Sequence, residues 1–201
     1  MSVTVFFTAL VSAMLINNVV LMRFLGICPF LGVSKKIESG IGMSFAVAFV
    51  MLVATLFTYI IYYVLLIPFE IEYLRTIAFI LVIASLVQFV EMFLKKFSKS
   101  LYKSLGIYLP LITTNCAILG VAEGNIITNF YETYGFMSGL WVSLTNALGT
   151  AAGFGLIMFA FSAIRVRLDA QNVPSEYKGV PISLVVAGIM SLAFFGLQGL
   201  I

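Results

Sequence analysis

The chain has 201 residues and a formal net charge of +3, and 62% of its residues are hydrophobic while only 9% are charged. Soluble domains carry about 25% charged residues, so this composition, with a mean hydropathy of +1.15, excludes a soluble globular protein. It indicates an all-α integral membrane protein, in which the placement of Lys and Arg matters more than their sum.

Six apolar runs are bounded by charged or turn residues, and each is long enough to cross about 30 Å of hydrocarbon. No basic n-region or cleavage site precedes the first run, so we expect it to be retained as a span. Together they predict one multi-pass domain over residues 1–201. The spans are expected at about Val3–Met22 with an extension through Val33, Gly40–Ile67, Leu74–Leu94, Leu101–Ala122, Tyr134–Ile164 and Val180–Ile201.

The basic residues fall mainly on one side of this arrangement. Nine of the eleven Lys and Arg residues lie in the first, third and fifth connections. The positive-inside rule therefore places these loops in the cytoplasm and both termini outside. The nine residues are Lys35, Lys36, Lys95, Lys96, Lys99, Lys103, Arg165, Arg167 and Lys178.

The only two cysteines stand in one phrase that occurs twice. Cys28-Pro29-Phe30-Leu31-Gly32-Val33 recurs as Cys116-Ala117-Ile118-Leu119-Gly120-Val121, at an offset of 88 residues from 28 to 116. We predict a duplication with halves at about 1–97 and 98–201. With three spans in each half, the halves are inverted repeats, and such repeats place a shared site near the bilayer midplane.

The first Cys phrase is expected to interrupt its helix. As one helix, residues 3–34 would be about 48 Å long, which exceeds the hydrocarbon thickness of about 30 Å. Gly26, Pro29 and Gly32 predict the position of the break, and a proline disfavours the α conformation at the preceding residue, here Cys28. The second phrase has Gly120 but no proline after its cysteine, so a broken helix is predicted there on less evidence.

The cysteines have three interpretations. A disulfide is the least favoured, because the pair would lie at membrane depth, away from oxidising machinery. Free Cys is commonly an inert buried hydrophobe, but metal coordination removes the thiol proton and would stabilise a thiolate within a membrane. Iron–sulfur clusters are typically held by four thiolates, so two cysteines and no histidine would need a second chain. The absence of histidine also excludes His-ligated haem.

Other polar side chains in the predicted spans are either functional candidates or partners in helix-to-helix hydrogen bonds. Glu91 is either a group on a cation path or, four residues from Lys95, the interfacial end of the third span. Gly135-xxx-Gly139 and Gly149-xxx-Gly153 have the spacing that allows close helix packing. The other polar candidates are Asn17, Asn18, Arg23, Gln88, Thr113, Thr114, Asn115, Thr145 and Asn146.

Three segments together resemble a known family. They are NNVVLMRFLGICPFLGVSKK at Asn17–Lys36, VQFVEM at Val87–Met92 and LGIYLPLITTNCAILGV at Leu105–Val121. The chain is similar over nearly its whole length to the A subunits of the Rnf complex, the ion-translocating ferredoxin:NAD oxidoreductase. The E subunit of the sodium-translocating NADH:quinone reductase shares the Cys phrases. Pro29, Thr114 and the Asn17-Asn18 pair favour the Rnf A subunit over the E subunit of the reductase.

The resemblance implies that the chain pairs with a paralogous partner of opposite orientation, the Rnf E subunit. Each would contribute two cysteines to one intramembrane iron–sulfur centre, [2Fe–2S], and the ligands here would be Cys28 and Cys116. Electrons from reduced ferredoxin would pass through this centre toward flavins in other subunits and finally to NAD. The coupled ion, Na⁺ or H⁺, would move outward across a bacterial or archaeal cytoplasmic membrane.

The same resemblance limits what the chain does alone. The family's flavin-attachment threonine motif and a ferredoxin-type cysteine cluster do not occur in it. We therefore expect a non-autonomous subunit of a redox-driven translocase, with neither flavin nor haem of its own. Its expected partners are the E subunit, the B, C, D and G subunits and the lipid bilayer, and no nucleic acid.

Two functions of other classes stay open. Inverted repeats and broken helices are also typical of secondary transporters, although the duplicated element here centres on cysteine and not on carboxylate or carbonyl ligands. The third interpretation is a scaffold subunit whose cysteines are inert.

Overall fold

The computed structural model describes residues 3–34, 37–97, 111, 112, 114–128, 135–171, 174 and 177–196. All regular secondary structure in these ranges is helical. Among the described residues, three helices are long and apolar enough to span a bilayer, Ile37–Leu66, Glu72–Met92 and Phe136–Leu168. Three further apolar helices are shorter, Phe6–Ile16, Cys116–Ile127 and Val180–Phe195. The chain is a helical membrane protein.

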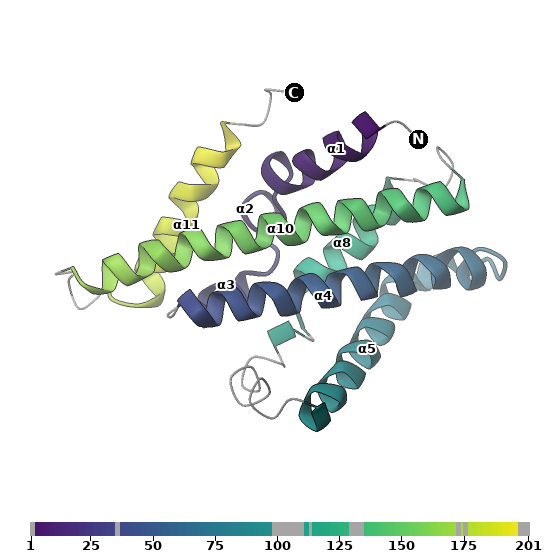
Figure 1. Cartoon of the computed structure of the whole chain (residues 1–201), viewed down its shortest axis with the longest axis horizontal. Coiled ribbons are helices and arrows are strands. Elements are labelled where there is room, and N and C mark those ends of the chain that lie inside the picture. The colour runs from purple at the N-terminus through teal and green to yellow at the C-terminus, as the bar shows by residue number, and fades with distance from the viewer. Residues whose placement is uncertain are drawn as a thin grey trace.

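Two long helices form the centre of the fold. Helix α4 (Ile37–Ile61), continued by the π-helical turn η2 (Tyr62–Leu66), lies beside α10 (Phe136–Asp169), and the two run in opposite directions (Figure 1). They share the most extensive helix contact in the described part of the chain. Each buries apolar side chains at helical spacing. These side chains are Met43, Val47, Met51 and Ala54 of α4, and Phe154, Ile157, Met158 and Phe161 of α10.

The remaining helices cover the two sides of this pair. Helix α5 (Arg75–Phe97), entered through the 3₁₀ turn η3 (Glu72–Leu74), packs on α4 and buries Phe79, Ile83 and Val87 on one face. Helix α11 (Val180–Phe195) lies on the opposite side, against α2 (Val19–Arg23) (Figure 1). Large apolar side chains on the outer faces of α5 and α11 are exposed, as expected where a membrane protein meets lipid or other subunits.

The first span is not the continuous helix predicted for Val3–Met22. Helix α1 (Val3–Val11) and the π-helical turn η1 (Ser12–Ile16) end at Asn17, and Asn18 is extended. The Asn18 side chain accepts a hydrogen bond from Val20 N at 3.1 Å and donates one to Met14 O at 3.1 Å. The asparagine thus competes with the helix backbone, which moves the first break upstream of the cysteine.

The fourth span is also interrupted. Residues 111 and 112 are helical, Thr114 and Asn115 are not, and α8 (Cys116–Ile127) begins at the cysteine. The predicted half-helix is therefore present, but the break precedes Cys116, and Gly120 lies inside α8. Residues 101–110 of the predicted span, Thr113, and residues 197–201 of the sixth span lie outside the described residues.

One of the two predicted small-residue contacts is confirmed. A Cβ on Gly149 would lie 2.7 Å from the Leu10 carbonyl oxygen, and one on Gly153 would lie 2.6 Å from the Met14 carbonyl oxygen. These glycines let α10 approach the backbone of α1 and η1. Gly135 has a different use, because it caps α10 at φ 79° and a Cβ there would meet nothing within 4 Å.

We expect Gly153→Ala to destabilise the protein, because the new methyl group would force two backbones apart. The cost should be about 1–3 kcal/mol, as for other overpacked contacts. The matched control is Gly188→Ala in α11, where a Cβ meets nothing within 4 Å and the change removes a helix-weakening glycine, worth up to about 1 kcal/mol. Thermal unfolding of the purified protein in detergent measures both. Equal midpoints for the two variants would contradict the contact.

Candidate functional site

The first Cys phrase follows a tight turn between two short helices. Helix α2 ends at Arg23, Phe24 and Gly26 adopt left-handed conformations at φ 54° and 82°, and α3 (Ile27–Val33) begins after them. The break predicted at Gly26 is confirmed. Cys28 is helical, as the second residue of α3, and its side chain is exposed.

The predictions that Cys28 is non-helical and that Pro29 and Gly32 mark the break are therefore wrong. Pro29 is the third residue of α3. A first-turn N–H has no partner within its own helix, so a proline there removes no helical hydrogen bond. The N–H of Phe30 closes the first turn on Gly26 O at 3.3 Å, which leaves Gly26 as the residue that redirects the chain.

The second Cys phrase begins directly after a helix cap. Asn115 is extended and its Oδ1 accepts a hydrogen bond from Ala117 N at 3.1 Å. Cys116 is the first residue of α8, and its side chain is partly buried. The free N–H groups at the start of a helix favour negative charge, so this position suits a thiolate that binds a metal.

The structure brings the turn before the first phrase into contact with the start of the second phrase, across 90 residues of sequence. The backbone N–H of Gly26 donates a hydrogen bond to Cys116 Sγ at 3.0 Å. A Cβ on Gly26 would lie 3.1 Å from Ala117 Cβ and 3.2 Å from Asn115 Oδ1, and one on Gly120 would lie 2.5 Å from Leu25 Cδ1. Glycine at both positions allows the turn before Cys28 to pack this closely on the second phrase.

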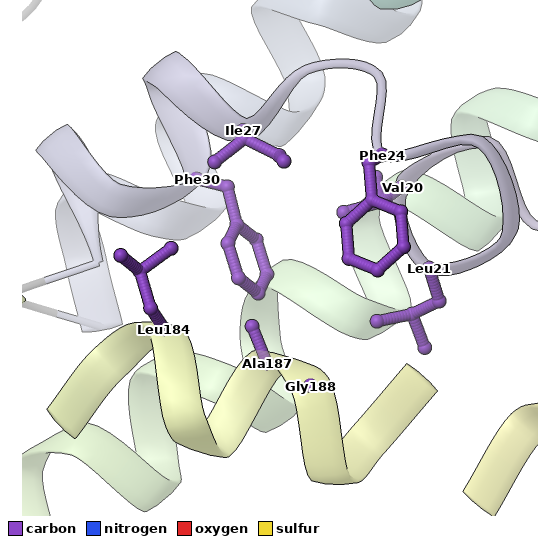
Figure 2. A pocket seen from close by; sticks show the side chains of 8 residues that line it. All are labelled: Val20, Leu21, Phe24, Ile27, Phe30, Leu184, Ala187 and Gly188. Carbon is purple, nitrogen blue, oxygen red and sulfur yellow. The ribbon is translucent and has the colours of Figure 1, made fainter. Parts of the chain in front are cut away.

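An apolar wall backs the first phrase. A cavity of about 70 Å³ separates the turn from α11, and Figure 2 shows Phe24, Ile27 and Phe30 facing Leu184 and Ala187 across it. Irregular backbone at membrane depth persists only where protein or a cavity surrounds it. Here α11 supplies that cover, and the Ser191 hydroxyl donates a hydrogen bond to the Leu21 carbonyl at 2.7 Å.

A separate crevice of about 330 Å³ has polar side chains in its lining. It brings together three of the polar residues singled out in the sequence, Asn17, Arg23 and Asn146. Asn146 Nδ2 also donates a hydrogen bond to Asn125 Oδ1 at 2.7 Å, so it does form the helix-to-helix bond expected of an amide in a membrane. Thr145 instead bonds the Trp141 carbonyl of its own helix at 2.8 Å.

Glu91 and Gln88 lie apart from this crevice on α5. Gln88 is exposed and Glu91 is partly exposed. The carboxylate of Glu123 on α8, which the sequence did not single out as a site, accepts a hydrogen bond from Thr76 Oγ1 at 2.5 Å. The role of Glu91 on a cation path stays a prediction.

Helix α3 is fixed to α10 by an arginine that the sequence predicts in a cytoplasmic loop. Helix α10 continues past the predicted end at Ile164, and Arg165 is only 5% exposed. Its Nη1 donates hydrogen bonds to Leu31 O and to Ser34 Oγ, each at 2.7 Å. A cation at the end of a helix complements the carbonyl dipoles there. Phe30 also stacks on Phe161, with ring centroids 4.0 Å apart.

The sequence does not reveal this role of Arg165, because its acceptors lie far away along the chain. The signal that could have found it is its position four residues after the buried Phe161, on the same face of α10.

The chain by itself offers few ligands for a metal. Within the described ranges, no group of three or more His, Cys, Asp or Glu side chains is placed to hold an ion. The two thiols therefore supply at most part of a coordination sphere.

A family model described as "Rnf-Nqr subunit, membrane protein" matches residues 6–201. The chain belongs to the Rnf-Nqr family of membrane subunits. This agrees with the resemblance seen in the Cys phrases.

Relatives in several bacteria match almost end to end. A Shewanella pealeana protein, named as the A subunit of an ion-translocating oxidoreductase complex, is 52% identical over 192 residues, which is 96% of each chain. An Acetobacterium woodii protein, named as the A subunit of a Na⁺-translocating ferredoxin:NAD⁺ oxidoreductase complex, is 51% identical over 191 residues, 95% of each chain. Both names are those of A subunits, in keeping with the Rnf side of the family.

We expect Arg165→Met to loosen α3 from α10, because it leaves the buried Leu31 carbonyl and Ser34 hydroxyl without their donor. Such a loss costs about 1–3 kcal/mol. Arg167→Met, on the same helix but exposed, should change stability by less than about 0.5 kcal/mol. Thermal unfolding and limited proteolysis between residues 27 and 34 would measure the difference. Equal protection of this segment in both variants would show that Arg165 does not hold it.

Proposed function

We propose that this chain is a membrane subunit of an ion-translocating ferredoxin:NAD oxidoreductase and that Cys28 and Cys116 hold half of an intramembrane iron–sulfur centre. The observation that carries the proposal is the hydrogen bond from the Gly26 N–H, in the turn that precedes Cys28, to Cys116 Sγ, 3.0 Å away. The reaction class comes from the names of the relatives in Shewanella and Acetobacterium. A cysteine kept only for packing would not need a backbone donor from the segment that leads to the other cysteine.

The residues present fit such a centre. Thiolates are the usual ligands of iron–sulfur clusters, and hydrogen bonds from backbone N–H groups to the sulfurs help to set their potential. Gly26 already donates to one of the two sulfurs. Its lack of a Cβ lets it approach the start of α8 closely enough to donate, because a Cβ there would lie only 3.1 Å from Ala117 Cβ and 3.2 Å from Asn115 Oδ1.

The missing ligands require a partner. Four thiolates usually complete a cluster, and this chain has two cysteines. The exposed side chain of Cys28 is accessible to a second subunit. The proposed partner is the paralogous Rnf E subunit, which would contribute two further cysteines to a shared [2Fe–2S] centre.

Each part of the site has a role in this scheme. When bound, the centre would supply one-electron transfer between other subunits of the complex, including B, C, D and G. Cys28 and Cys116 would hold the iron, the Gly26 N–H would stabilise negative charge on the Cys116 sulfur, and α11 covers one side of the turn. Arg165 fixes the helix that carries Cys28. Glu91 is the candidate for the path of the coupled Na⁺ or H⁺.

Two features support an inverted-repeat arrangement with halves at about 1–97 and 98–201. The long helices α4 and α10, one from each half, run in opposite directions (Figure 1). Asn18 and Asn115, again one from each half, cap a short helix in the same way. With basic loops on the cytoplasmic side, both termini would lie outside the bacterial or archaeal cytoplasmic membrane.

Cys28→Ala and Cys116→Ala should each remove the visible absorption and the paramagnetic signal of the centre and abolish ferredoxin-driven NAD reduction. The purified membrane complex should lose the corresponding iron. The control is Ser85→Ala, which removes a hydroxyl that bonds the Leu81 carbonyl of its own helix and should leave signal and activity unchanged. Retention of both the signal and the activity in either cysteine variant would refute the proposal.

A further inference from the structure

The side chain of Asn115 caps α8 with its oxygen, and its amide nitrogen has no hydrogen-bond partner among the described residues. Its Oδ1 accepts a hydrogen bond from Ala117 N at 3.1 Å, which fixes the orientation of the amide. The residue is 4% exposed, and its Nδ2 is a buried donor that finds no acceptor among the described residues. Buried donors in native proteins nearly always have a partner, so this N–H group points to an acceptor that the described residues do not supply.

The matching cap in the other half shows that the unused donor does not follow from the motif. Asn18 caps α2 in the same way, with Oδ1 accepting from Val20 N at 3.1 Å. Its Nδ2 donates a hydrogen bond to Met14 O at 3.1 Å. Two asparagines with the same local role thus differ in one respect, and the one with the free donor is adjacent to Cys116.

The surroundings of Asn115 indicate what the acceptor is. Asn115 Oδ1 lies 3.2 Å from the position of a Cβ on Gly26, and the Gly26 N–H donates to Cys116 Sγ at 3.0 Å. The Asn115 amide oxygen and the Cys116 thiol therefore both lie beside the Gly26 backbone. The acceptor that suits a second N–H donor at this place is a sulfur atom of a cluster held by Cys116.

We infer that Asn115 is a positioning residue whose Nδ2–H group donates a hydrogen bond to sulfur of that cluster. The inference rests on the proposed function, since it requires iron and sulfur at Cys116. A donor to sulfur stabilises the additional negative charge of the reduced state and so raises the reduction potential. Asn115 would thus tune the centre without being one of its ligands.

The test compares Asn115→Ser with Asn18→Ser in the purified complex, by redox titration followed with paramagnetic resonance. Serine caps helices about as well as asparagine, so both variants keep the capping acceptor and replace the amide N–H donor by a hydroxyl on a shorter side chain. We expect Asn115→Ser to lower the ratio of reduced to oxidised centre at a fixed potential about tenfold, equivalent to about 59 mV for one electron. Asn18→Ser should leave this ratio unchanged. A cluster with the same potential in both variants would overturn the inference.

Asn115→Asp provides a second variant, because it keeps the shape and the capping oxygen while removing the donor. It should lower the potential at least as far as serine does, since it also adds negative charge. Iron lost from both Asn115 variants in complexes that still assemble would support the inference, because the cap acceptor is intact in each. Failure of both complexes to assemble would overturn it in favour of a structural role.

The wild-type complex separates the two proposals. If the wild-type complex contains no iron, or if iron remains in both cysteine variants, the proposed function and the inference are both contradicted. Cysteine-dependent iron with an unchanged potential in Asn115→Ser would sink only the inference.

Discussion

Helices that end within a membrane protein leave backbone N–H and C=O groups that lipid cannot satisfy, and the breaks around the two cysteines are built to satisfy them internally. Asn18 and Asn115 accept from the first turns of α2 and α8, and the Ser191 hydroxyl and Arg165 donate to carbonyls at the ends of α2 and α3. The Gly26 N–H at the turn between those two helices goes to the sulfur of Cys116 instead. A backbone N–H at the helix break is therefore satisfied by a sulfur atom of the candidate site.

The repeated phrase in the sequence and the pair of asparagine caps in the structure do not have the same register. The sequence phrases pair Cys28 with Cys116, and in the structure the turn before Cys28 contacts Cys116 through Gly26. The caps pair Asn18 with Asn115 instead, so Cys116 opens its helix directly after an asparagine while Cys28 follows a glycine turn. Sequence identity alone could not show this, because the apolar run continues on both sides of Asn18.

Most of the long helices are predictable because apolar length is a strong signal in membrane proteins. Helices α4, α5 and α10 occupy the predicted second, third and fifth runs with shifted ends. Individual polar and turn-forming residues are harder to place. Pro29 predicts a break, yet the first turn of a helix tolerates proline. Arg165 reads as a loop residue because its acceptors come from α3, more than 130 residues away.

The length of α10 has a consequence for where the protein meets water. Its 34 residues extend about 51 Å at 1.5 Å per residue, against about 30 Å of hydrocarbon. Even a tilt of about 40°, near the upper end for membrane helices, would bury a path of only about 39 Å, or about 26 residues. The remaining turns must emerge into the headgroup layer, and the end that carries the exposed Arg167 is suited to do so. One rigid rod therefore links the segment bearing Cys28 to the aqueous boundary.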